Sequence, residues 1–216
     1  MTWLLWKEYR LQRFILAVGI FLLVFPHAVR YFANAAPEAI GYAAFVSTIL
    51  SILTLALLGG NAIASERADR SAEFQAYQPI SRGVILATKL LIPVLAACVL
   101  WGVNLYVFDH WSPIAYAELR GNREWMLRFF IFGFAAFSVA WLLSAIQSSP
   151  TFAIGAGMAA PVATMMLLAL LAWLASGLGF EPFGQSFNNT WSTVNLTLGL
   201  LSLTGGTAYY LLRVEP

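Results

Sequence analysis

A series of long, nearly uncharged apolar stretches is the feature that most constrains this 216-residue chain. A helix needs about 20 mainly apolar residues to cross a bilayer. Six stretches reach or approach that length: 14–32, 40–63, 84–108, 129–146, 150–176 and 194–212. Lipid offers the backbone no hydrogen-bond partner, so each stretch is predicted to be a transmembrane helix. The runs are continuous rather than alternating, which argues against a transmembrane barrel.

The composition leaves room for little else. Charged residues make up 10% of the chain, against about 25% in soluble domains. The formal charge of +2 gives no reason to expect a nucleic-acid partner. One cysteine and two histidines exclude an internal disulfide and a cysteine- or histidine-rich metal cluster. We therefore expect an all-α integral membrane protein with a single transmembrane domain over 1–216.

The positive charges indicate an orientation. Loops with more lysine and arginine stay in the cytoplasm. One side of the predicted bundle carries eight of these residues, namely Lys7, Arg10, Arg13, Arg67, Arg70, Arg82, Lys89 and Arg213. The other side carries four, namely Arg30, Arg120, Arg123 and Arg128. We expect a multi-pass protein of the inner (cytoplasmic) membrane with both termini in the cytoplasm.

The segment 1–13 mixes aromatic and basic side chains. This mixture suits the headgroup layer of a membrane. We expect an interfacial helix here, ahead of the first span.

Several chemistries are missing from the sequence. The only lysines are Lys7 and Lys89, and neither follows a glycine-rich phosphate-binding loop. No Asp or Glu falls inside a predicted span, so no ion-coupling carboxylate is expected. A zinc-protease motif and a serine-hydrolase elbow are also absent. We predict no catalytic residue and no metal site, and any uphill transport would need energy from another subunit.

The loop 64–83 is the most charged part of the chain. Glu66 and Arg70 have the spacing of a helical ion pair, and Phe74 and Tyr77 would share one face of that helix. Pro79 would end the helix, and Ser81 would cap the next one. From the residues alone, this amphipathic helix is either a docking element that enters a groove on a partner or a solvated connector on the membrane surface.

The same loop carries a recognisable pattern. Glu66-Arg67, Glu73-Phe74, the run 79–82 (Pro-Ile-Ser-Arg) and Lys89 follow one another between the second and third spans. This pattern resembles that of the permease subunits of type-2 ABC transporters. The layout is also similar, with a basic-aromatic N-terminal segment, six spans and both termini inside.

The resemblance implies a function and partners. Residues 66–77 would be a coupling helix docked on a separate ABC ATPase, which would bind ATP and Mg²⁺. The docking residues would be Glu66, Arg67, Asp69, Arg70, Glu73, Phe74, Tyr77, Pro79, Ser81 and Arg82. A second permease copy, identical or paralogous, would complete the transporter. Residues 177–193 would form a re-entrant or interfacial segment on the outer side. The aromatic, almost uncharged spans suggest export of an amphipathic or apolar substrate.

Two other functions stay open. A non-transporting scaffold or assembly protein would bind a soluble partner through the same loop. An intramembrane enzyme or ion-coupled carrier is disfavoured, because the sequence lacks the carboxylates and motifs that those activities need.

Some single residues allow sharper expectations. Lys89 lies about two turns into the third span, so we expect it to extend toward the cytoplasmic headgroups, with substrate contact as the alternative. Asn104 is expected to bond between helices. Small residues of the fifth and sixth spans are expected to mark close helix contacts. They are Gly155, Gly157, Ala159, Ala160, Gly199, Ser202 and Gly206. Ser149 is predicted to cap the fifth span, because a proline follows it at the first helical position.

Overall fold

The computed structural model describes residues 2–33, 39–68, 80–111, 123–177 and 185–213, and every regular element within these ranges is a helix. The helices are α1 (Thr2–Phe32), α2 (Ala39–Asn61), α3 (Ala64–Ala68), α5 (Arg82–Trp111), α7 (Arg123–Ile146), α8 (Pro150–Gly177) and α9 (Gln185–Arg213).

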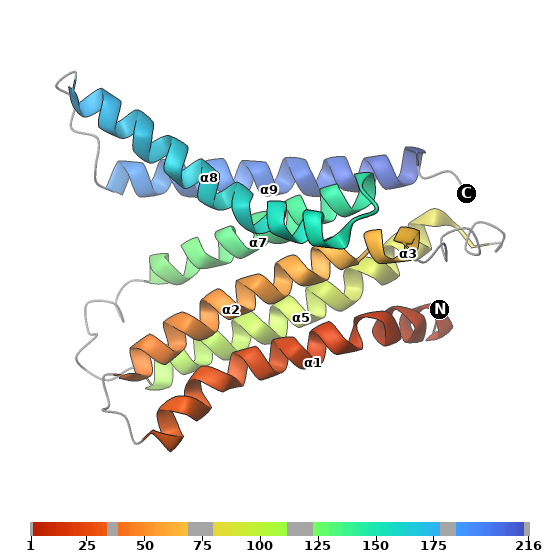
Figure 1. Ribbon diagram of the computed structural model, residues 1–216, viewed down its shortest axis with the longest axis horizontal. Helices are drawn as coiled ribbons and strands as arrows, with labels where there is room; N and C mark the ends of the chain where they lie inside the picture. The colour runs from red at the N-terminus through yellow and green to blue at the C-terminus, as the bar shows by residue number, and fades with distance from the viewer. Residues whose placement is uncertain (1, 34–38, 69–79, 112–122, 178–184, 214–216) are drawn as a thin grey trace.

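Two helices form the centre of the bundle (Figure 1). On one side α2 packs against α1 and α5, and on the other side α7 packs against α8 and α9. The contact between α2 and α7 joins these two groups, and α8 also reaches α2. We call α1, α2 and α5 the first group and α7, α8 and α9 the second group.

Five helices are long and apolar enough to cross a membrane. They are α1, α2 with its short extension, α5, α7 and α8. The expectation of an all-α, multi-pass membrane protein is therefore confirmed. Although α9 has 29 residues, it is not among the five, because asparagine, serine and threonine recur along it. The sixth span stays a prediction.

The helix ends differ from the expected boundaries in two places. Residues 2–13 form no separate helix, since they continue directly into α1. Their inner face is buried against the bundle, with Leu4, Glu8 and Gln12 each at most 4% exposed. Residues 185–193 belong to the first turns of α9, whereas 178–184 lie outside the described residues. That residues 1–13 lie at the membrane interface remains a prediction. That residues 177–193 form a re-entrant or interfacial segment remains one as well.

The predicted cap of α8 is confirmed. The helix begins at Pro150, and the Ser149 hydroxyl accepts a hydrogen bond from the backbone N–H of Phe152 at 3.3 Å. The cap satisfies one of the N–H groups that the first turn leaves without an intrahelical partner.

Small residues bring the helices of the second group close together. A Cβ atom added to Gly157 would lie 2.6 Å from the Cβ of Ala140 on α7. One added to Gly206 would lie 2.8 Å from the Cα of Leu142. Both are closer than real carbon contacts, so the predicted close approaches are confirmed. The same expectation was wrong for Gly155, because a Cβ atom added there would meet open space.

Asn104 joins α5 to α2, as expected. Its amide nitrogen donates to the Ser51 hydroxyl at 2.9 Å and to the Leu100 carbonyl at 2.8 Å. The Thr48 hydroxyl lies 3.5 Å from the amide oxygen. All three polar side chains are buried, so these hydrogen bonds fix the contact between the two helices.

Candidate functional site

Four charged side chains meet inside the first group, at the end of the bundle where the N-terminus lies. Lys7 and Glu8 come from α1, Glu66 from α3 and Lys89 from α5. We call these four residues the buried charge cluster. Glu8 is 1% exposed, Glu66 is 4% exposed and Lys89 is fully buried. Every salt bridge that joins two described residues lies within this cluster, so it is the natural starting point for a functional site.

Lys89 is the centre of the cluster. Its ammonium nitrogen lies 2.5 Å from Glu66 Oε2 and 3.2 Å from Glu8 Oε1. The same nitrogen donates to the backbone carbonyl of Ala62 at 3.2 Å. One side chain of α5 thus holds α1, α3 and the turn before α3 together. The expectation that Lys89 extends to the headgroups was wrong, because two carboxylates and a carbonyl satisfy its ammonium group inside the protein.

Lys7 completes the cluster at its outer side. Its ammonium nitrogen lies 2.8 Å from Glu66 Oε1, and its side chain is 23% exposed. Glu66 therefore receives one lysine on each carboxylate oxygen. Two positive and two negative charges balance within the cluster.

The local sequence explains how Glu66 reaches this position. The helix α2 ends at Asn61, and a turn at 62–63 redirects the chain into α3. Ala62, Ile63 and Ala64 are buried, so the turn lies against the bundle and not in solvent. The backbone N–H of Arg67 donates to the Ile63 carbonyl at 3.3 Å. These constraints direct the Glu66 side chain inward.

The energetics favour a cluster that stays intact. Charges in a low-dielectric interior are costly unless they are paired and hydrogen-bonded. Once the four groups are paired, removing any buried member leaves an uncompensated charge, which costs about 3–5 kcal/mol in comparable cases. The cluster therefore behaves as a cross-link between three segments that are distant in sequence.

A second contact fixes the other end of the loop. The Arg82 guanidinium, at the first position of α5, donates to the Leu211 carbonyl of α9 at 3.1 Å. The described residues on the two sides of this loop therefore lie beside the buried charge cluster and beside the end of α9.

The expected docking residues have different positions. Glu66 points into the bundle instead of outward, because Lys7 and Lys89 bind its carboxylate. Arg67 is half-buried, whereas Ser81 and Arg82 are exposed. The remaining residues lie outside the described residues: Asp69, Arg70, Glu73, Phe74, Tyr77 and Pro79. Their docking role stays a prediction.

Sequence reasoning missed Lys7 and Glu8 as site residues. Both lysines of the chain belong to the cluster. The signal that the sequence offered was the position of Lys89 inside an apolar stretch. A lysine inside an apolar stretch needs a carboxylate partner, and Glu8 and Glu66 flank the predicted spans at the same end of the bundle.

Within the described ranges, no group of three His, Cys, Asp or Glu side chains could hold a metal ion. Comparison with family models, curated proteins and solved structures finds no match. The candidate site therefore depends on the geometry of the chain and on the pattern in its loop.

Proposed function

We propose that this chain is the membrane-spanning permease subunit of an ATP-driven ABC transporter. A separate ATPase would dock on the loop that begins at α3, and ATP and Mg²⁺ would bind to that ATPase. The chain would export an amphipathic or apolar substrate. A second permease copy, identical or paralogous, would complete the assembly.

The observation that supports this proposal is the contact between Glu66 and Lys89. They are the first and last residues of the loop pattern that resembles type-2 permeases, and their side chains form a buried ion pair. Glu66 also bonds to Lys7, so a displacement of the loop would reach α1 and α5 directly. This is what a loop that transmits ATPase motion to the spans requires.

The proposal includes a membrane arrangement. In it α9 is the sixth span, and both chain termini lie in the cytoplasm together with the buried charge cluster and the loop. The excess of lysine and arginine at this end supports that orientation.

A crosslinking experiment tests the docking step. A photo-crosslinking amino acid would replace Tyr77 in the loop, and a matched control would replace Tyr31, an exposed aromatic at the other end of α1. We expect the Tyr77 position alone to crosslink to a protein with ATPase activity. A crosslinked partner without ATPase activity would favour the scaffold function, and equal crosslinking from both positions would contradict docking at the loop.

A second experiment tests transmission through the buried charge cluster. Spin labels at Val29 on α1 and Val103 on α5, in a Cys98→Ala background, report the distance between two helices that Lys89 connects. We expect this distance to change when the ATPase is trapped with ATP and vanadate. In Glu66→Gln the ATPase should still bind and hydrolyse ATP, but the distance change should be lost. An unaltered change in Glu66→Gln would show that the cluster does not transmit the motion.

A further inference from the structure

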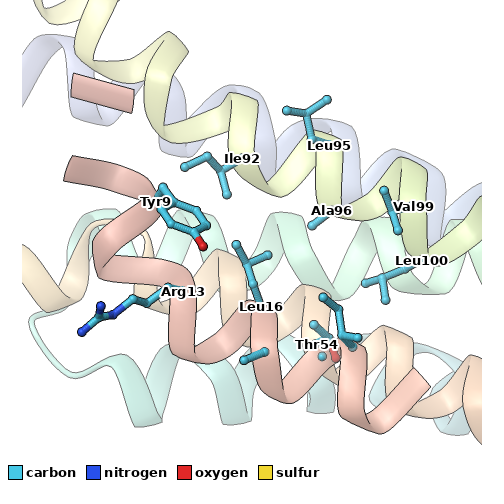
Figure 2. Close-up of a pocket in the computed structure, with 12 residues that line it drawn as sticks. Tyr9, Arg13, Leu16, Thr54, Ile92, Leu95, Ala96, Val99 and Leu100 are labelled. Carbon is cyan, nitrogen blue, oxygen red and sulfur yellow. The ribbon is translucent and has the colours of Figure 1, made fainter. Parts of the chain in front are cut away.

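A groove of about 420 Å³ lies between α1, α2 and α5, on the side of the first group away from α7 (Figure 2). Its walls come from α1 and α5, and Thr54 of α2 lies at its base. The buried charge cluster is not part of its lining, so the groove is a separate feature.

The groove is apolar along most of its length. Leu16 of α1 faces Leu95 and Val99 of α5 across it, and Ala96 leaves space between them. The polar group at the base is already satisfied, because the Thr54 hydroxyl donates to the Leu50 carbonyl at 2.9 Å. Nothing in this part of the groove would require a polar occupant.

One end of the groove has a different chemistry. Tyr9 and Arg13 line that end, one turn apart on α1. Figure 2 shows the Tyr9 hydroxyl beside Leu16, whereas the Arg13 guanidinium extends outward from the groove. Arg13 is exposed and forms no salt bridge with a described residue. A cation with no carboxylate partner among the described residues therefore lies at the mouth of an apolar groove.

The length of the groove fits a lipid tail. From Arg13 to Ile20, which also lines it, α1 rises about 10 Å at 1.5 Å per residue. One leaflet contributes about half of the 30 Å hydrocarbon core, so the groove covers roughly two thirds of the depth of a leaflet. Leu95 and Val99 are 56% and 57% exposed, which leaves the groove open along its side to membrane lipid.

We propose that this groove binds one anionic membrane phospholipid. An acyl chain would lie between α1 and α5 down to Thr54, and the phosphate would bind the Arg13 guanidinium at the mouth of the groove. Charge complementarity favours a lipid with a net negative headgroup over a zwitterionic one, because Arg13 lines the groove and forms no salt bridge with a described residue. This inference is independent of the proposed ATPase partner.

Native mass spectrometry of the delipidated full chain tests the headgroup. The probes are phosphatidylglycerol, phosphatidylcholine with the same acyl chains, and oleate. We expect one phosphatidylglycerol to bind about tenfold more tightly than phosphatidylcholine, and Arg13→Gln to remove most of this preference, since a charged hydrogen bond is lost. The matched control Arg10→Gln changes an exposed arginine outside the groove lining and should alter the preference less than about twofold.

A second pair of variants tests the acyl-chain channel. Ala96→Phe places a ring in the groove and should abolish the tightly bound lipid. Val94→Phe adds a ring at an exposed α5 position outside the groove lining and should leave binding unchanged. Size-exclusion profiles and helical content would establish that both variants fold, and Arg13→Gln remains informative if Ala96→Phe does not. Equal binding of the two phospholipids, tighter binding of oleate, or full binding to folded Ala96→Phe would overturn the proposal.

Discussion

The two groups of helices are held together by different physical means. In the first group, a four-residue charge cluster and the Asn104 hydrogen bonds connect α1, α2, α3 and α5. In the second group, glycines let α8 and α9 approach α7 closely, and in the first group Gly19 of α1 approaches Thr54 of α2 in the same way. No salt bridge joins two described residues of the second group.

This difference implies different responses to force. Ion pairs on long side chains act between backbones that are not in direct contact, so they can hold segments together while these shift slightly. Close contacts at glycines are short-ranged, and a small displacement loses much of their dispersion energy. We infer that the first group is suited to transmit displacement, whereas the second group provides a rigid support against which it can move.

The largest expected effect comes from removing the centre of the buried charge cluster. In Lys89→Met, two buried carboxylates would share Lys7 as their remaining lysine, so we expect the free energy of unfolding to fall by about 3–5 kcal/mol. The matched variant Lys7→Met removes a partly exposed lysine and should cost at most about 1 kcal/mol. Unfolding of the purified chain in mixed detergent and SDS measures both. Equal losses in the two variants would mean that burial does not distinguish the two lysines.

A smaller effect is expected in the second group. Gly157→Ala would press its new methyl group against Ala140 and the Ala136 carbonyl, so we expect a loss of about 1–3 kcal/mol. Gly155→Ala, two residues earlier on the same helix, meets open space and should stabilise the helix by about 0.5–1 kcal/mol. The same unfolding assay compares the pair, and a loss of stability in both would contradict the contact between α7 and α8.

The smallest effect should come from Asn104. Hydrogen bonds between membrane helices contribute about 0.6 kcal/mol on average and up to about 1.7 kcal/mol. Asn104→Ala should therefore destabilise the chain less than Lys89→Met. Combined with Ser51→Ala, it should cost less than the sum of the two single changes, because their side chains bond to each other. Strict additivity would show that this hydrogen bond contributes nothing.

Much of the fold could be predicted because the relevant physics is local. A long apolar run must satisfy its backbone internally, whatever surrounds it, and five of the six predicted spans appear as helices that could cross a membrane. The cap at Ser149 could also be predicted, because it involves only residues that are neighbours in sequence. The continuity of α1 was missed, because the polar residues of 2–13 indicated a separate segment, whereas the contacts that bury Glu8 and Gln12 come from distant helices.

The candidate site was only partly predictable for the same reason. The loop pattern drew attention to Glu66 and Lys89, but their direct contact depends on how α3 meets α5. Lys89 and Glu8 are 81 residues apart, and no local periodicity relates them. Lys89 was therefore expected to extend toward water, because a lone ammonium group favours water. Its actual environment depends on the carboxylates of Glu8 and Glu66.

The buried charge cluster has a consequence for movement in an electric field. A lone elementary charge that crosses the whole potential drop of a membrane exchanges about 2.3 kcal/mol with it per 100 mV. Lys7, Glu8, Glu66 and Lys89 together sum to zero, so displacing them as one unit carries no net charge along the field. The voltage across the membrane would neither drive nor oppose a joint displacement of these four side chains.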